Sequence, residues 1–399
     1  MRWRPVAFCL AFALLALSCR HMQPAPTHSK KHPQHAVLTF RWQKPLHSNM
    51  PNFQVPGMFE ANDRFYPVET AGIGFDTDAR RVFIGAAVGG FYCLDAFSGQ
   101  TVWRYSLRTP VGSTPIYDAE RLRVYFGTDD GVLYALHARS GRLLAQLETG
   151  AEIRRKIWLR EDTIYFANAD NTVMAVDPMT FETIWRYRRA PVEGFSAAGY
   201  SDLRFDGDSV YVGFSDGFVV SLDAATGVAN WEQDLASEAV ANLKPNEFKL
   251  SDIDATPVVI RQTAIAASVA GGVFGMDAET GNILWARPDL DMVTGMGEAF
   301  EEVVVLRAGN RGMTVLNPET GETRLTSMFG MGHKSDPVLY DDVLLVTDTE
   351  AGMYAISVGT GEVLQRLDMN GGFFSRPSEY GGYLFVLGNW STLYAFSIR

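Results

Sequence analysis

Few residues in this chain of 399 have types and spacings that suit chemistry. Four of the seven histidines lie between Arg20 and His35, in a Pro- and Lys-rich run that suits a solvated spacer better than metal capture. Elsewhere there are only His47, His137 and His333, and no H-E-x-x-H or phosphate-binding glycine motif is present. We therefore expect a protein that is not an enzyme, with no catalytic residue, no metal site and no cofactor.

The charge of the chain argues against a nucleic-acid partner. The formal net charge is −11, and the first 36 residues contain five basic residues and no acid. Residues 37 to 399 therefore carry 30 basic and 46 acidic side chains, which is −16. Such an acidic body would be repelled by a phosphate backbone.

The N-terminus reads as a lipoprotein export signal. Two arginines precede an apolar run from Val6 to Leu17, which is too short for a comfortable membrane span, and A-L-S-C then ends at Cys19. The small residues before Cys19 resemble a bacterial lipobox, so we expect a signal peptide at 1–18, lipidation at Cys19 and a flexible tether at 19–35. The alternative is an ordinary cleaved signal with an incidental cysteine. Cys93 then has no disulfide partner and is expected in the core.

One phrase repeats through the rest of the chain. Asp277 to Trp285 reads D-A-E-T-G-N-I-L-W, in which an Asp-to-Gly turn joins two strands. Aligned on its first residue, the phrase recurs at intervals of 42, 40, 46, 54, 40, 40 and 40 residues. The first residues are Asp95, His137, Asp177, Asp223, Asp277, Asn317, Ser357 and Ser397. This period, made only of strand signals, predicts an all-β fold: an eight-bladed β-propeller over 36–399 with four antiparallel strands per blade.

The two ends of the chain are complementary halves of one blade. Ala36 to Gln43 looks like an outgoing strand with no turn before it, and Arg376 to Arg399 has incoming strands and no outgoing one. We expect the N-terminal strand to close the last blade and so to remove free sheet edges.

Five of the eight expected Trp positions hold Trp, and a Trp at a fixed blade position is expected to pack between blades. Stacking on a flat cofactor is the alternative. The Trp positions are Trp42, Trp103, Trp185, Trp231 and Trp285, with Ala145, Leu325 and Gln365 at the other three.

Departures from the period indicate a binding face. Trp231 to Pro257 spans 26 residues where Trp103 to Pro115 spans 12, and the links after Trp42 and Trp185 are also long. All three join one blade's last strand to the next blade's first, so they lie on one face, and insertions gathered on one face usually mark the binding surface.

The repeats resemble the PQQ-like propeller repeat, and the longer phrases are similar to the BamB family of lipoproteins in the outer-membrane β-barrel assembly machinery. The phrases are L-S-D-I-D-A-T-P-V-V (Leu250 to Val259), V-E-G-F-S-A-A (Val192 to Ala198) and S-D-P-V-L-Y-D-D (Ser335 to Asp342). The resemblance covers essentially the whole mature chain.

The resemblance implies a partner: a POTRA domain of a BamA-like barrel protein, bound through loops of two adjacent blades. One loop carries Leu250, Asp252 and Asp254. The alternative interpretation of the two acids is that their short side chains only cap the loop. In the other loop the family's Leu, Leu and Arg fall on Ala190, Val192 and Glu193, so Glu193 reverses the charge.

A shift of the alignment by one or two residues would give the family's arginine role to Arg188 or Arg189. The resemblance also implies an outer-membrane location, lipid-anchored and facing the periplasm, in a chain that is monomeric within a hetero-complex. Two other readings stay open: a periplasmic propeller that binds another protein or cell-wall material, and a quinoprotein-type dehydrogenase. Such dehydrogenases have a vicinal Cys-Cys pair, which this sequence lacks.

Overall fold

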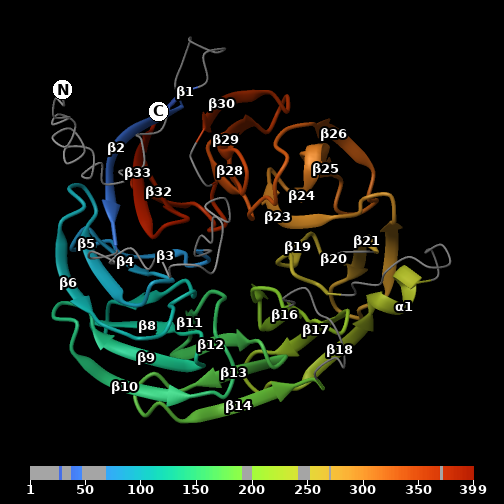
Figure 1. The fold of residues 1–399 in the computed structure, drawn as a ribbon. Coiled ribbons are helices and arrows are strands. Elements are labelled where there is room, and N and C mark those ends of the chain that lie inside the picture. Colours follow the sequence, from blue (N-terminus) through green and yellow to red (C-terminus); the bar gives the residue numbers. More distant parts are fainter. Residues whose placement is uncertain are drawn as a thin grey trace, which may run out of the picture.

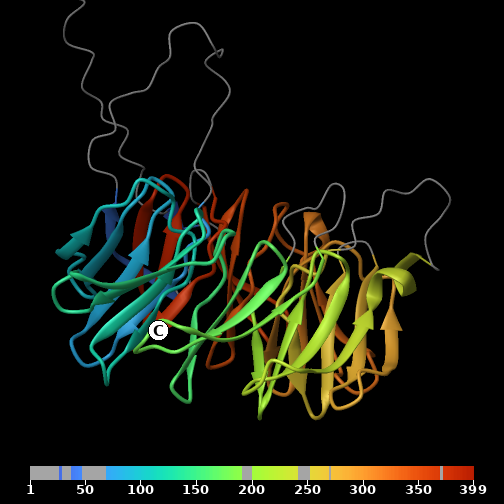
Figure 2. The ribbon, with the colours of Figure 1, turned by 90° about the horizontal axis from the view of Figure 1, so that it is seen from below.

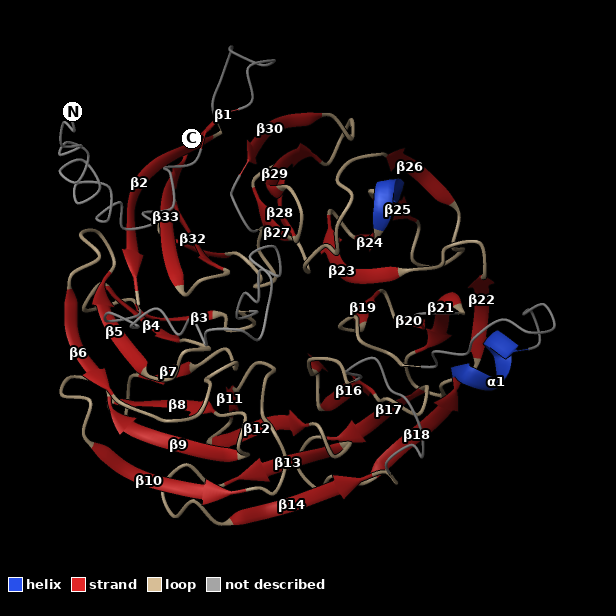
Figure 3. Cartoon of the chain, in the orientation of Figure 1, coloured by secondary structure: helices blue, strands red, loops and turns tan. Residues whose placement is uncertain are grey.

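The computed structural model describes residues 27–28, 37–46, 69–190, 200–240, 252–268, 271–368 and 372–399. Within these ranges the chain is almost entirely strands, with one α-helix, α1 (Leu235–Val240), and one short 3-10 helix, η1 (Gly309–Arg311) (Figure 3). Neither of these two helices of the described part could span a membrane. The expected site residues Cys19, Val192, Glu193 and Leu250 lie outside it.

The strands form eight antiparallel sheets around a common centre, which confirms the predicted eight-bladed β-propeller (Figure 1). The first strand of each blade is nearest the centre and the last is at the outside (Figure 1). Blade one consists of β3 (Ile73–Asp76), β4 (Arg81–Gly85), β5 (Phe91–Asp95) and β6 (Thr101–Tyr105), and blade two of β7 (Ile116–Asp118), β8 (Arg123–Gly127), β9 (Val132–His137) and β10 (Leu143–Glu148). Blade three consists of β11 (Trp158–Arg160), β12 (Thr163–Asn168), β13 (Thr172–Val176) and β14 (Thr183–Arg188), and blade four of β15 (Arg204–Asp206), β16 (Ser209–Gly213), β17 (Phe218–Asp223) and β18 (Ala229–Asp234). Blade five consists of β19 (Val258–Ile260), β20 (Thr263–Ser268), β21 (Gly272–Asp277) and β22 (Ile283–Arg287), and blade six of β23 (Val293–Ala299), β24 (Glu302–Arg307), β25 (Met313–Leu316) and β26 (Thr323–Ser327). Blade seven consists of β27 (Val338–Tyr340), β28 (Val343–Asp348), β29 (Gly352–Ser357) and β30 (Val363–Asp368), and blade eight of β31 (Ser378–Tyr380), β32 (Tyr383–Gly388), β33 (Thr392–Ile398) and β2 (Leu38–Pro45). A two-residue strand, β1 (Thr27–His28), pairs with β30 as a fifth strand of blade seven.

The antiparallel order gives the ring two distinct faces. Turns between first and second strands, and the D-A-x-T-G turns between third and fourth strands, lie on what we call the motif face. Turns between second and third strands lie with the inter-blade connections on the opposite side, the connection face. Edge-on, α1, which belongs to a connection, lies at the rim of the ring (Figure 2).

The repeated turn forms as its residue types predict. The Asp277 carboxylate accepts hydrogen bonds from the backbone N–H groups of Glu279 (3.1 Å) and Thr280 (2.8 Å) and from the Thr280 hydroxyl (2.8 Å). These bonds, led by the one from the hydroxyl, lower the pKa of Asp277. Gly281 has a φ of +76°, a conformation that few other residues adopt without strain.

The Trp residues join neighbouring blades, which confirms that they pack between blades. The indole Nε1–H of Trp231 donates to the carbonyl of Ala278 in the next blade at 2.9 Å. Its ring lies on Gly281, where a Cβ would be only 2.6 Å from ring carbon. The other four Trp residues make the same contact with the next turn, in the pairs Trp42 with Ala96, Trp103 with Ala138, Trp185 with Ala224 and Trp285 with Pro318.

In all eight blades, the outer strand has one unpaired extra residue directly before the Trp position. In blade four it is Asn230, because Trp231 pairs with Ser221 while Ala229 pairs with the adjacent Leu222. Such a bulge bends the strand and re-aims the side chain that follows. The same shift in register occurs in the other seven blades.

At the positions that lack Trp, other groups connect the neighbouring blades. In blade two Ala145 leaves room for Phe181, which replaces the turn glycine of blade three, adopts a φ of +61° and is buried. Arg123 supplies the missing donor to the Pro178 carbonyl at 2.5 Å. In blade six Leu325 packs beside Gly361, and Arg324 donates to the Val358 carbonyl at 3.2 Å.

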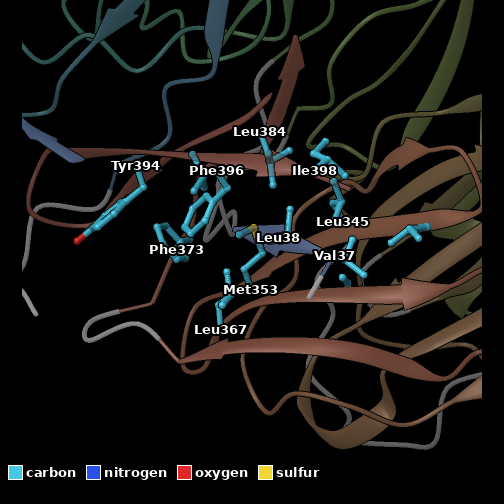
Figure 4. Packing of buried hydrophobic residues seen from close by; sticks show 13 residues of the cluster. Val37, Leu38, Leu345, Met353, Leu367, Phe373, Leu384, Tyr394, Phe396 and Ile398 are labelled. Carbon is cyan, nitrogen blue, oxygen red and sulfur yellow. The ribbon is translucent and has the colours of Figure 1, made fainter. Parts of the chain in front are cut away.

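The ring closes through the N-terminal strand, as predicted, although the strand covers Leu38–Pro45 rather than residues 36 to 43. β2 pairs with β33 from Leu38 opposite Ile398 to Pro45 opposite Thr392. At the last Trp position, Gln365 of blade seven accepts from the Leu38 N–H (2.7 Å) and donates to its carbonyl (3.0 Å). A cluster of buried side chains that includes Leu38 and Phe396 fills the space between blades seven and eight (Figure 4).

Glu69 makes a second closing contact, on the connection face. It is fully buried, and its carboxylate accepts from the Ala87 N–H (2.9 Å) and from the Ser391 hydroxyl. Burial raises its pKa to about 7, against the smaller lowering effect of these hydrogen bonds. Blade one is thus tied to the second turn of blade eight by a carboxyl that is poorly solvated.

Cys93 lies in β5 and is fully buried with no disulfide partner, as expected. Burial raises the pKa of its thiol to about 12, so the group is neither ionised nor accessible at neutral pH.

Where blades two and three meet, Ala145 stands in place of Trp and Phe181 in place of the turn glycine. We therefore predict that the effects of substitutions at these two positions on stability are coupled. Ala145→Trp alone should overfill the site occupied by Phe181, and Phe181→Gly alone should empty it, each lowering the free energy of unfolding by about 2 kcal/mol or more. The double variant restores the Trp-on-Gly contact of the other blades and should be far less destabilised than the sum. Denaturant unfolding followed by circular dichroism measures all three, and strictly additive effects would contradict the exchange.

Glu69 predicts a specific pH dependence. Because its pKa rises from 4.5 in the unfolded chain to about 7 in the folded one, the folded state holds this proton more tightly. This contribution to stability is full below about pH 4.5 and is lost as the pH rises to about 7. Glu69→Gln should therefore raise the melting temperature at pH 8 relative to wild type, and flatten its pH dependence between 5 and 7 by on the order of 2 kcal/mol. Glu279→Gln, at an exposed turn position, is the matched control and should leave that dependence unchanged.

Candidate partner-binding site

The two connections to which the family resemblance assigns partner binding start at the neighbouring blades three and four, on the connection face. The first follows β14 and is described again from Tyr200; the second follows β18 and is described again from Asp252. Asp234 ends β18 and caps α1, accepting from the N–H (3.0 Å) and hydroxyl (2.5 Å) of Ser237. Leu235 is fully buried and its N–H donates to the Gly217 carbonyl at 3.0 Å, so the start of the second connection is fixed to blade four.

The S-D-I-D phrase is anchored by its isoleucine. Ile253 is fully buried, and its N–H donates to the Phe214 carbonyl at 3.3 Å. It occupies the place where a Cβ on Gly213 would lie, at 2.2 Å. The neighbouring Asp252 is drawn in with it and is only 2% exposed. Asp252 is therefore placed to fix the loop rather than to reach a partner from the surface of the free chain.

Asp254 is placed differently from Asp252. It is partly exposed, but its Oδ1 is buried and has no hydrogen-bond partner. Burial raises the pKa of this carboxyl, an effect opposed by Arg155 and reinforced by Asp252. A buried acceptor without a donor is costly, so Asp254 is the acid of the pair that gains most from a new donor.

Of the two arginines that could take the family's arginine role, Arg189 is already engaged. Its guanidinium bonds to Asp216 at 2.6 Å and pairs with Glu232, and its central carbon lies 3.8 Å from the centre of the Phe218 ring. Its side chain is 14% exposed. Arg189 therefore holds blade three to blade four.

Arg188 is the available one. Its side chain is 51% exposed and pairs with Asp170 at 2.6 Å. An exposed pair of this kind contributes little to stability and can be exchanged for a partner's carboxylate at small cost. Together, Arg188 and Asp254 are the described side chains from the two predicted loops that are best placed to meet a partner.

The central ends of the blades hold charged residues that sequence reasoning did not single out. Two residues before the first strands of blades three, four, seven and eight stand Lys156, Asp202, Asp336 and Arg376. They share one position in the repeat, which for Asp336 and Arg376 is directly before Pro337 and Pro377. This shared position is the sequence feature that could have identified them. Their side chains influence one another across the centre. Burial raises the pKa of Asp336, an effect opposed by Arg376 and reinforced by Asp202, and burial lowers the pKa of Lys156, an effect opposed by Asp202 and reinforced by Arg376.

One enzyme-like pattern also needs its structural context. Gly213–Gly217 has the spacing G-x-S-x-G, which in α/β-hydrolases forms a strained turn between a strand and a helix. Here the segment joins two antiparallel strands, β16 and β17, and the Ser215 hydroxyl exchanges hydrogen bonds with the Asn171 side chain at 2.8 and 3.1 Å. Ser215 thus ties neighbouring blades together. In the part of the chain that the structure describes, no group of three His, Cys, Asp or Glu could hold a metal ion.

Comparisons with known proteins agree with this architecture. The family model described as "Outer membrane protein assembly factor BamB" matches residues 41–149 and 118–324. The protein of that name from Shewanella oneidensis is 25% identical over 319 residues, which covers 74% of this chain and 76% of the relative. The crystal structure of BamB from Moraxella catarrhalis has a TM-score of 0.71 at 18% identity, covering 91% of this chain and all of that one.

The same fold occurs in enzymes. The quinohemoprotein alcohol dehydrogenase from Comamonas testosteroni has a TM-score of 0.65 at 14% identity, covering 90% of this chain and 76% of that one. At this identity the likeness concerns the propeller and not the chemistry.

Proposed function

The chain belongs to the BamB family of outer membrane protein assembly factors, and from this membership we propose that it is a non-catalytic scaffold in the assembly of outer-membrane β-barrel proteins. The observation that carries the proposal is the match of the family model over residues 41–324, which includes the S-D-I-D connection and the loop before it. The relatives' printed name, assembly factor, supports a binding role rather than a catalytic one.

We propose that the partner is a POTRA domain of a BamA-like barrel protein, held on the connection face by the loops around residues 188–196 and 236–254. Arg188 and Asp254 would make the polar contacts, with Val192, Glu193 and Leu250 beside them in the same loops. Asp252, held inside by Ile253, would act by fixing the loop. Opposite charges across such a contact set register and association rate more than affinity.

We further propose that the protein is an outer-membrane lipoprotein that faces the periplasm. Residues 1–18 would be the signal peptide, Cys19 would carry the lipid, and 19–35 would connect the anchor to the propeller. An anchor at one end leaves the connection face free to bind the partner as a monomer within the hetero-complex.

The test is affinity purification of the tagged, lipidated protein from detergent-solubilised membranes. The combined variant Arg188→Glu with Asp254→Asn should lower recovery of a BamA-like barrel protein by about tenfold, because it reverses one contact charge and removes the other. The matched control is Arg261→Glu: Arg261 is also half-exposed in an ion pair, but it lies on the motif face. Its recovery should equal that of wild type.

Equal recovery from the combined variant and wild type would contradict the proposed site while leaving the partner in place. Absence of any such barrel from both forms would contradict the assembly role itself. Asp252→Asn separates the two acids: it should lower the melting temperature, whereas Asp254→Asn should not, because only Asp252 is fully inside the blade.

A further inference from the structure

A cavity of about 340 Å³ opens at the centre of the ring, away from the connections discussed above. It lies between the first strands of blades four to seven and the segment that enters blade eight. Its walls include Arg204, Val258, Met296, Leu339 and Arg376. The volume is near the lower end of the ~300–1,000 Å³ that is usual for small-molecule sites.

The carboxylates at this centre are already engaged by donors from the protein. Asp336 accepts from the Met296 N–H at 2.9 Å and from the Thr256 hydroxyl at 2.8 Å. Asp202 accepts from the Lys156 N–H at 2.7 Å. Within the described part of the chain, neither Asp336 nor Asp202 forms an ion pair with Arg376 or Arg204.

The cations retain unused donors. Arg376 is exposed to the cavity and donates to the Pro337 carbonyl at 3.2 Å, and within the described part of the chain it forms no ion pair. Arg204 pairs through Nη2 with Glu298 at 3.1 Å, but its Nε–H is buried with no partner. Two guanidinium groups from blades four and eight thus border one cavity with N–H groups to spare.

Two exposed apolar side chains also border the cavity. Leu339 is 37% exposed and Phe300 is 59% exposed, whereas Val258 and Met296 are buried behind the wall. Leu339 and Phe300 favour a ligand with a small apolar group, since contact with them removes hydrocarbon surface from water.

We propose that this central cavity binds a carboxylate carried on a short apolar group. The planar forks of Arg376 and Arg204 receive the carboxylate, a geometry that guanidinium groups recognise well. Glu298 and Asp336 border the same cavity, so a second negative charge on the ligand would be repelled. One carboxylate is therefore a better fit than a phosphate dianion.

Two sources supply this chemistry: a free short-chain carboxylic acid, and the carboxyl end of a peptide with an apolar last residue. The proposal goes beyond the assembly role and does not depend on it, because the cavity residues are distinct from those of the connection loops.

The experiment titrates the purified protein with hexanoate and with N-acetyl-valyl-leucine, and follows binding by calorimetry and melting temperature. Both ligands, or one of them, should bind saturably below about 20 mM. Hexan-1-ol and the C-terminal amide of the same dipeptide should not. A response to the dipeptide alone assigns the site to chain ends, and a response to hexanoate alone assigns it to free acids.

Arg376→Gln should weaken the binding by about tenfold or more, through loss of charge-assisted hydrogen bonds, and Arg376→Lys should weaken it less. Arg261→Gln on the motif face is the matched control and should bind as wild type does. Leu339→Asn tests the apolar wall without changing any charge and should also weaken binding. Circular dichroism confirms that each variant is folded.

The proposal is overturned if neither acid binds saturably, if hexan-1-ol or the peptide amide binds equally well, or if folded Arg376→Gln binds as tightly as wild type.

Discussion

The contact between an indole ring and the backbone of the next blade's turn holds this molecule together. A β-sheet of four short strands has two faces to bury and cannot do so alone, so each blade depends on its neighbours. The Trp position meets that need at one point, because the ring covers the glycine of the next turn and its N–H satisfies a carbonyl that would otherwise be shielded from water. The Asp of the turn presents that carbonyl and glycine in a fixed geometry. Each repeat therefore supplies a Trp position to the contact with the next blade and a turn to the contact with the preceding blade. These contacts recur with the period of the sequence.

Because the joints lie near the motif face, the opposite face is free to vary. The inserted connections all leave from the connection face, and they are fixed to the blades by a few buried apolar anchors such as Leu235 and Ile253. Such anchors explain why the S-D-I-D phrase keeps an isoleucine between two acids. The isoleucine fills the space above Gly213, and its burial places the flanking acids in two different environments: Asp252 is buried and Asp254 is partly exposed. A short motif can in this way supply both the support and the contact of a binding loop.

The sequence was sufficient to predict the blade number, the turn, the inter-blade role of Trp and the closing strand, because each depends on residues a fixed distance apart. It was not sufficient where two repeats compensate each other. Ala145 and Phe181 are ordinary departures from the repeat when taken singly, and only their contact in space shows that one replaces the other. The burial of Asp252 was hidden for a similar reason, since it follows from the packing of Ile253 and not from the acid itself. The charged residues at the centre are spread over several blades, so the side chains that influence one another there, such as Asp336 and Arg376, are far apart in the sequence.

The centre of the ring differs from the joints because side chains there meet across blades that are not adjacent. Thr256 of blade five reaches Asp336 of blade seven, and Arg204 of blade four reaches Glu298 of blade six. These contacts are possible because blade six has Gly295 and Gly297 at its inner end, where a Cβ would strike the Ser335 carbonyl and the Pro337 ring. The glycines bring the neighbouring acids and bases close together. Asp336 is bound by a backbone and a hydroxyl donor and Asp202 by a backbone donor, whereas Glu298 pairs with Arg204. The surplus of donors on Arg204 and Arg376 is thus a consequence of how the inner strands pack, in a chain whose overall charge is strongly negative.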